Sequence, residues 1–192
     1  MCPLTRAIQP AAWSFVLLAT VLSVPATGTS HGPPASGATA GNAQESGDVE
    51  AALERIREVT RPFHDIEAAH RAGYPTAVPQ CIDSQAGGMG HHYVHPKLLD
   101  ATLEIDKPEI LVYAPQPDGT LKLAGVEYIV PLSAWRDSEA PRILGQPLKR
   151  SEQLGIWYLH VWVWEENAKG MFADWNPAVK CPKGRAGQGG AG

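Results

Sequence analysis

Three histidines stand close together in the stretch GGMGHHYVHP, residues 87–96, directly after a run of glycines. Imidazole nitrogens bind transition metals and transfer protons near neutral pH, so His91, His92 and His95 are candidates for either chemistry. In an extended segment, successive side chains point to opposite faces. His92 therefore lies on one face and His91 and His95 on the other, and a site here needs partners from other parts of the chain.

Two such partners stand in strand-like stretches further along. Glu127 lies in LKLAGVEYIV, where alternation places it on the same side as Leu123 and Ile129, and His160 lies among aromatic residues in IWYLHVWVWEEN. A buried carboxylate is costly unless it has a cation or hydrogen-bond donors nearby. We therefore predict that His92, Glu127 and His160 converge from separate strands.

Two imidazoles and one carboxylate suit a single divalent ion, Zn(II), Cu(II), Fe(II) or Mn(II), with an open position for water or substrate. Asp174, in FADWNP, is a candidate fourth ligand or an acceptor that orients a ligand imidazole, and His91 and His95 are further candidates around the site. A metal-bound water could hydrolyse or hydrate a small substrate. Without a metal, Glu127 and His160 could act as base and acid.

The same three side chains also fit a metal-free arrangement. Glu127 would accept a hydrogen bond from His160, and His92 would bond to a backbone carbonyl, which gives a satisfied polar network. The protein would then bind a small molecule or serve as a structural protein of the cell envelope, with its tryptophans lining a pocket or core. No HExxH, clustered CxxC or GxSxG pattern decides between these hypotheses, so enzymatic activity stays an open question.

A helical pattern precedes these strands. Val49, Leu53 and Ile56 recur at helical spacing, with Ser46 as a candidate N-cap and Gly73 as a candidate stop. Pro62 interrupts the pattern, which predicts a kink or a second helix. The same region contains EAAH, residues 67–70, but di-iron bundles need that Glu-x-x-His spacing twice, so we interpret it as exposed polar residues.

The elements after this region are predicted to be strands. Residues 110–114 and 121–130 flank the turn sequence PQPDGT and indicate a hairpin, and a second long strand begins at Ile156. Together these patterns predict an α+β fold in which an N-terminal helical segment packs on a mainly antiparallel β-sheet. The predicted single domain spans residues 47–182, with a disordered linker at 27–46 and a disordered tail at 183–192.

The first 26 residues are typical of a cleaved signal peptide. Arg6 is their only charge, and it precedes an apolar run that is shorter than the ~20 residues needed to span a bilayer and ends in a small-x-small site. We therefore expect a periplasmic or extracellular protein that does not span a membrane after cleavage. A net charge of -4 without a Lys/Arg cluster argues against nucleic acid as a partner.

Signal cleavage would remove Cys2 and leave Cys81 and Cys181. An exported protein meets an oxidising compartment, where such a pair most often forms a disulfide. A thiolate metal pair is the alternative, and the long separation without CxxC spacing argues against it.

The motifs MGHHYVHP, VEYIVP and LHVWVWEENAKGMFADWNPAVKC resemble those of an uncharacterised family of exported bacterial proteins, over about residues 74–181. The family pattern reads MGxHYVNP, VEYxVP and LHVWxWxxNPxGxFxxWNPxxxC. The resemblance implies a shared fold without an established activity, and it places the family's polar positions on His92, Glu127 and His160. His95 and Ala168 depart from the pattern, and His91 falls where the pattern is open.

Overall fold

The computed structural model of the protein describes residues 37–77 and 80–182. The predicted signal peptide at 1–26, the first part of the predicted linker and the predicted tail at 183–192 lie outside the described residues. These three predictions are therefore not tested by the structure.

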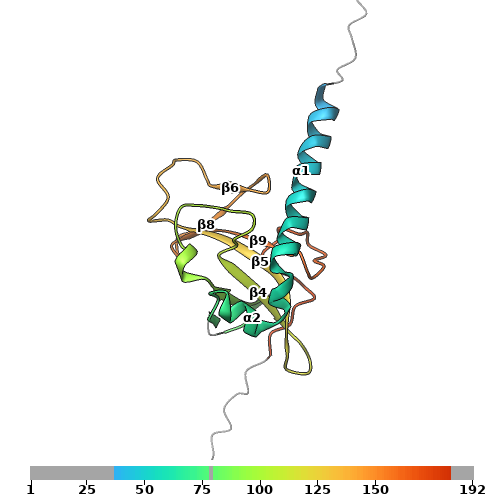
Figure 1. Cartoon of the computed structure of the whole chain (residues 1–192), viewed down its shortest axis with the longest axis vertical. Coiled ribbons are helices and arrows are strands. Elements are labelled where there is room, and N and C mark those ends of the chain that lie inside the picture. The colour runs from blue at the N-terminus through green and yellow to red at the C-terminus, as the bar shows by residue number, and fades with distance from the viewer. Residues whose placement is uncertain (1–36, 78–79, 183–192) are drawn as a thin grey trace, which may run out of the picture. The chain divides into compact units, whose positions relative to one another are not determined.

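The helical region consists of two helices joined by a short 3-10 turn (Figure 1). Helix α1 (Gly37–Thr60) is followed by η1 (Arg61–His64) and α2 (Ile66–Arg71). Pro62 lies in the first turn of η1, so of the two predicted outcomes the structure has the break into two helices. A carboxylate oxygen of Asp65 accepts a hydrogen bond from the Glu67 N–H and caps α2.

The predicted N-cap at Ser46 is wrong, because α1 begins at Gly37 and residues 37–46 are helical. Once a helix has formed, each added residue contributes one hydrogen bond at the cost of ordering only itself. The stretch before Ser46 contains several alanines, which have the highest helix propensity, so the helix can extend backward through it.

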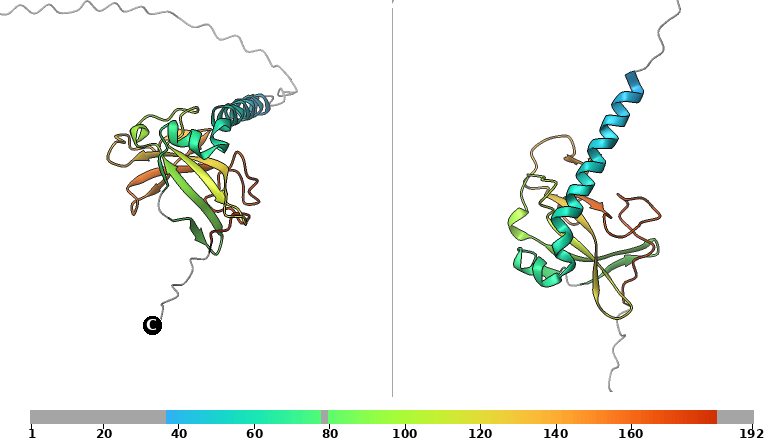
Figure 2. Two further views of the ribbon diagram at one scale, coloured as in Figure 1. Left: turned by 60° about the horizontal axis from the view of Figure 1, so that its bottom comes forward. Right: turned by 45° about the vertical axis from the view of Figure 1, so that its right-hand side comes forward.

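A seven-stranded sheet forms most of the fold, in the order β1-β3-β4-β5-β9-β8, with β2 paired to β3. Figure 2 shows the ribbon from two further sides. Every pair of neighbouring strands in it is antiparallel, which confirms the predicted antiparallel character. A separate two-stranded hairpin is formed by β6 and β7. The strands are β1 (Thr76–Ala77), β2 (Ile82–Ser84), β3 (Gly87–Val94), β4 (Ile110–Pro115), β5 (Leu121–Pro131), β6 (Arg142–Ile143), β7 (Gln146–Pro147), β8 (Lys149–Ser151) and β9 (Ile156–Val161). A second 3-10 turn, η2 (Pro96–Leu98), follows β3.

The predicted hairpin is formed by β4 and β5, but its alternation is interrupted. Val112 pairs with Gly125 and Tyr113 pairs with Leu123, so β5 contains one extra residue at Ala124. Such a bulge reverses the alternation on its two sides. Leu123 therefore packs on the opposite face from Glu127, and the prediction that they share a side is wrong.

The strand that begins at Ile156 is shorter than its sequence pattern indicates. β9 ends at Val161, and the backbone N–H groups of Trp164 and Glu165 both donate to the carbonyl of Ala124 in the bulge of β5. Because both N–H groups donate to this one carbonyl, the regular ladder between β5 and β9 does not continue past Val161. Trp164 leaves the sheet and donates its indole N–H to the Thr60 hydroxyl of α1.

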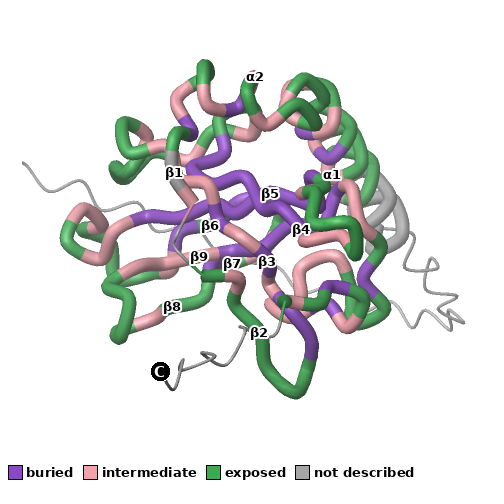
Figure 3. Tube along the Cα trace, turned by 90° about the horizontal axis from the view of Figure 1, so that it is seen from below, coloured by how far each residue is buried: buried purple, intermediate pink, exposed green. Residues whose placement is uncertain are grey.

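Each face of the sheet has its own buried cluster (Figure 3). The tyrosine face contains Leu111, Tyr113, Val126, Tyr128 and Leu159, and Leu53 and Ile56 of α1 are buried in the same cluster. The histidine face contains Ile110, Val112, Ala114, Ile129 and Trp162, together with Val179 from near the C-terminus. Buried stretches of β4 and β5 run through the middle of the view, whereas β8 is exposed at an edge.

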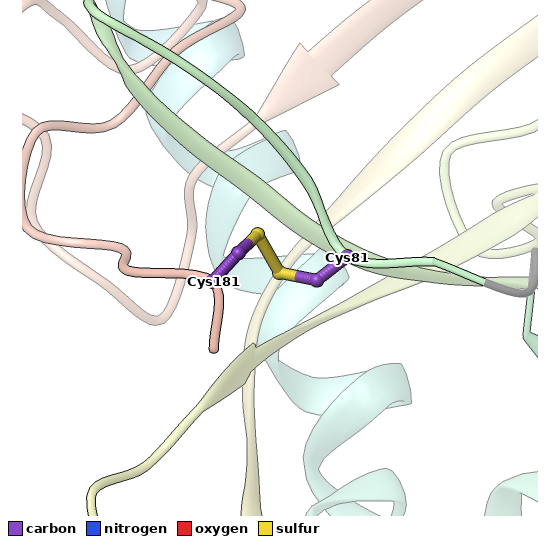
Figure 4. Close-up of a disulfide and its surroundings, with 2 residues drawn as sticks. All are labelled: Cys81 and Cys181. Atoms are coloured by element: carbon purple, nitrogen blue, oxygen red, sulfur yellow. A yellow bond between two sulfur atoms is a disulfide. The ribbon is translucent and has the colours of Figure 1, made fainter. Parts of the chain in front are cut away.

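The predicted disulfide is present (Figure 4). Cys81, directly before β2, is bonded to Cys181, and their Cα atoms lie 5.5 Å apart. The sequence separation of 100 residues means that the bond closes most of the described chain into one loop. Among the described residues, no helix is both long enough and apolar enough to cross a bilayer.

Candidate metal centre

His92 reaches the histidine face from the middle of β3, because it pairs with Val112 of β4 and alternates with its neighbours. The glycines before it let the strand approach other backbone closely. At Gly90, which has a positive φ of 88°, an added Cβ would overlap the Tyr113 carbonyl oxygen. Glycine at this position therefore allows β3 to pair with β4 at the point where His92 follows.

Glu127 and His160 are directly opposite each other in the ladder between β5 and β9. Directly opposed residues on one face of an antiparallel pair have Cβ atoms about 4.5–5.5 Å apart. The bulge at Ala124 sets the phase of β5 so that Glu127 points to the face that carries His160. The convergence predicted from the sequence is thus produced by sheet register.

The three side chains meet in a small space. His92 Nε2 lies 3.0 Å from His160 Nε2 and 3.5 Å from Glu127 Oε2. His160 Nδ1 lies 3.6 Å from Glu127 Oε1. One ligand atom from each residue lies within 4.8 Å of those of the other two.

Burial shifts the protonation of all three groups. His92 is 4% exposed, Glu127 5% and His160 2%. Burial raises the pKa of Glu127 to about 8, and the charges of Asp174 and Glu109 act in the same direction. Burial lowers the pKa of His92 to about 4 and that of His160 well below its usual value. Both imidazoles are therefore neutral at neutral pH, which is the form that binds metals.

The metal-free network is incomplete. Hydrogen bonds to nitrogen have heavy-atom separations of about 2.7–3.2 Å, and both contacts of Glu127 to the imidazoles are longer than this. His92 Nδ1 and His160 Nδ1 are buried and have no hydrogen-bond partner. The backbone of Gly90 raises the pKa of His92 and so partly offsets the effect of burial. Even so, His92 Nδ1 has no partner that meets the geometry of a hydrogen bond.

Two of the separations between these donor atoms suit a divalent ion. Two ligand atoms each about 2.0–2.2 Å from a tetrahedral ion lie about 3.3–3.6 Å apart. The separations of 3.0 Å and 3.5 Å around His92 Nε2 are close to that range. A cation between the three groups would also offset the cost of burying the Glu127 carboxylate. The buried cluster could therefore hold a metal ion.

Aromatic and charged residues surround the cluster. The Trp162 ring stacks on His160 at an interplanar angle of 12°, and Tyr158 packs against His160 edge-on. Asp174, predicted as a fourth ligand or an orienting acceptor, is instead paired with Lys149 and accepts a long bond of 3.4 Å from the Tyr158 hydroxyl. Asp174 and Lys149 are near enough for their charges to shift the pKa values of Glu127 and His160.

The other histidines predicted around the site lie elsewhere. His91 is half-buried on the opposite side of β3 from His92, and it does not belong to the group that could hold a metal. The His95 ring packs edge-on against Tyr74, with a centroid separation of 5.0 Å. His70, from the EAAH motif, contacts Glu67 at 3.7 Å and stacks on Tyr93.

One buried carboxylate was not predicted. Glu109, at the start of β4, is 1% exposed, and its Oε2 accepts a hydrogen bond from the Ile129 N–H. Burial raises the pKa of Glu109 to about 8. Glu109 directly precedes the apolar run ILVYA. A carboxylate next to a strand-like apolar run was the feature of the sequence that pointed to its burial.

Neither of two cavities that lie among the described residues includes a residue of the cluster. The larger, about 510 Å³, lies between the β4–β5 hairpin and the C-terminal residues, and it is bordered by Lys122, Glu165 and Val179. The smaller, about 20 Å³, borders Glu109 and Asp100. The three residues of the cluster are themselves buried.

Comparison with known proteins gives no assignment. No family model matches the chain, and neither a curated protein nor a solved structure matches it. The functional argument therefore depends on the geometry of the site.

Proposed function

We propose that this is an exported protein that binds one divalent metal ion through His92, Glu127 and His160. The observation that carries the proposal is that three donor atoms from β3, β5 and β9 meet within 4.8 Å in a buried position. The Glu127 carboxylate supports it, because both of its contacts with the imidazoles are longer than a hydrogen bond and a cation would compensate for its burial.

The donor set narrows the choice of metal. Borderline nitrogen donors with one carboxylate suit Zn(II), Cu(II) and Fe(II), and Mn(II) binds such sites more weakly. The burial of the three residues favours retention of the ion over turnover of a substrate, because a catalytic metal keeps an open position for water or substrate. Asp174 would act from outside the three ligands, through Tyr158 and through its charge.

The proposal also includes export of the protein and the packing of the helical segment on the sheet. The disulfide is compatible with an oxidising compartment, which supports export by the predicted signal peptide. The resemblance to uncharacterised exported bacterial proteins also supports export. In this proposal the helical segment is the layer on the tyrosine face, supported by the burial of Leu53 and Ile56 in the cluster of that face.

Metal content and metal-dependent stability test the proposal. The untagged protein, freed of metal with a chelator and returned to Zn²⁺, is expected to bind one ion per chain. At a free Zn²⁺ concentration 100 times the Kd, the free energy of unfolding should rise by about 2.7 kcal/mol. His92→Ala and His160→Ala should each abolish this gain.

His91→Ala is the matched control, because His91 is the neighbour of His92 on the other side of the same strand. It should bind Zn²⁺ as the parent protein does. A parent protein that binds no Zn²⁺, Cu²⁺, Fe²⁺ or Mn²⁺ would leave the metal-free network as the better description. That alternative has one observation in its favour, the direct 3.0 Å contact between the His92 and His160 rings.

A further inference from the structure

The last described segment of the chain lies over the proposed metal site. Residues 171–181, which we call the C-terminal cover, follow Trp162, whose ring stacks on His160. The Trp162 indole N–H donates to the Ala173 carbonyl at 2.6 Å, and its backbone N–H donates to the Met171 carbonyl. Further along, Val179 is buried in the cluster of the histidine face. Ala173 and Val179 of the cover therefore contact the face that holds the three ligands, whereas Met171 and Phe172 pack against the cluster of the tyrosine face.

Few hydrogen bonds and ion pairs between the sheet and the cover hold the cover in place. Gly88 and Asn176 exchange two backbone hydrogen bonds of 3.0 Å each, which form an isolated bridge and not a strand. Lys149 adds a bond to the Phe172 carbonyl and the ion pair with Asp174. The Asn176 side chain also donates to the Glu166 carbonyl, and the Trp175 carbonyl accepts from the Asn167 side chain. None of these contacts is part of a continuous ladder.

The disulfide is the covalent attachment at the end of the cover (Figure 4). Cys181 is the last residue but one that the structure describes, and its partner Cys81 directly precedes β2. β2 pairs with β3, the strand that carries His92. The bond thus ties the C-terminal end of the cover to the part of the sheet that supplies one of the ligands. Both cysteines are only partly buried.

We propose that the Cys81–Cys181 disulfide is a redox latch that controls how fast the metal leaves the site. A dithiol reductant would give two electrons and two protons to the disulfide, forming two thiols, and would itself become a disulfide. The end of the cover would then be held only by its local contacts, and the cover would open more often. This inference rests on the proposed metal site and adds its regulation.

Zinc release tests the latch. The full chain and the Cys81→Ala/Cys181→Ala variant are loaded with Zn²⁺ alone, and transfer of the ion to a chromophoric chelator is followed in time. We expect release from the variant to be at least tenfold faster than from the oxidised parent. A phosphine reductant, which does not add competing thiols, should produce the same acceleration in the parent and none in the variant.

A matched variant separates cover opening from general loss of stability. Leu53→Ala shortens a buried side chain of α1 in the cluster of the tyrosine face, whereas Val179, near the disulfide end of the cover, is buried in the cluster of the histidine face. It should destabilise the protein yet release Zn²⁺ at the rate of the parent. Equal release rates for the oxidised parent and the double cysteine variant would overturn the latch while leaving the metal site intact. An oxidised parent that binds none of Zn²⁺, Cu²⁺, Fe²⁺ and Mn²⁺ would instead overturn the proposed function and the latch with it.

Hydrogen exchange provides a readout for the case in which the double variant does not fold. In the parent, reduction should speed exchange of the Gly88 and Asn176 amides at least tenfold, because these amides form the bridge between sheet and cover. The amides of β4 and β5 should keep their protection. Unchanged exchange at Gly88 and Asn176 after reduction would also overturn the latch.

Discussion

At the scale of single residues, the protein places ionisable groups where water cannot solvate their charges. Glu127 and Glu109 lie on opposite faces of the sheet, and burial raises the pKa of each to about 8. A protein retains such groups when a partner or a function compensates for their cost. Glu127 has two imidazoles beside it, whereas Glu109 has the Ile129 N–H.

Glu109 gives the protein a specific dependence of stability on pH. Its pKa is higher in the folded protein than in the unfolded chain, so the unfolded chain loses this proton near pH 4.5 and the folded protein keeps it to about pH 8. Stability is therefore lost as pH rises through this window, by at most about 1.4 kcal/mol per pH unit for one group. Below pH 4.5 both states hold the proton, and the contribution is constant.

Glu109→Gln should remove this component while keeping an acceptor for the Ile129 N–H. Chemical denaturation in the presence of a chelator, from pH 4 to 8.5, would compare the variant with the parent. The variant should gain stability relative to the parent as pH increases above about 5. A difference that is the same at every pH would show that Glu109 titrates at its ordinary pKa in the folded protein.

At the scale of elements, the positions of His92 and Glu127 depend on glycines that let backbone segments lie close together and on a bulge in β5. An added Cβ at Gly87, whose φ is 133°, would overlap the Asn176 carbonyl oxygen, and one at Gly88 would lie 2.9 Å from Val179 Cγ1. The glycines before His92 thus let the C-terminal cover lie against β3. In β5, the bulge at Ala124 gives Glu127 its direction.

Gly87→Ala should be more destabilising than Gly119→Ala. Both glycines have positive φ, but an added Cβ at Gly119 has no neighbour within 4 Å. The control should cost about 1 kcal/mol from backbone strain alone, and Gly87→Ala should cost about 3 kcal/mol or more because a clash is added. Urea denaturation measures both, and similar costs for the two variants would mean that the approach of Asn176 is not a constraint.

The tyrosine face is joined to the helical region by a buried hydroxyl. Tyr113 donates to the Phe63 carbonyl at 2.6 Å, so Tyr113→Phe should leave that carbonyl without its partner and cost about 1–2 kcal/mol. Tyr158→Phe is the comparison, because its hydroxyl makes only a 3.4 Å contact. Thermal unfolding of both variants would contradict the assignment if Tyr158→Phe were the more damaging change.

At the scale of the whole molecule, one covalent bond spans most of the fold. The disulfide joins positions 100 residues apart, and on the chain-entropy model a loop of this length contributes about 4–5 kcal/mol by restricting the unfolded chain. The proposed ion would add a second long-range connection, because its ligands come from three strands.

The Cys81→Ala/Cys181→Ala variant should therefore lose up to about 4–5 kcal/mol of unfolding free energy in the presence of a chelator. Adding Zn²⁺ should restore part of this loss, since an ion that binds only the folded state stabilises it by mass action. Denaturation curves with and without Zn²⁺ measure both quantities. A loss well under 1 kcal/mol would mean that the bond does not act mainly on the unfolded chain.

The amino-acid sequence by itself was sufficient for features that depend on local pattern. Alternating apolar residues around PQPDGT predict the β4–β5 hairpin, and the pair of cysteines predicts the disulfide. His92, Glu127 and His160 were identifiable as candidates because each is an ionisable residue in a strand-like stretch and falls on a polar position of the family pattern. Period-two alternation and residue chemistry are local properties, so they can be read from one chain.

Tertiary structure alone decided how these elements meet. The bulge at Ala124 reverses alternation within one strand, and the same carbonyl ends β9 at Val161, which no local pattern indicates. Strand register brings Glu127 opposite His160, and pairing through β4 brings His92 to both. Asp174 forms an ion pair with Lys149, a contact between residues 25 positions apart in the chain. These outcomes depend on contacts between residues distant in the chain, and those contacts exist only after the sheet has formed.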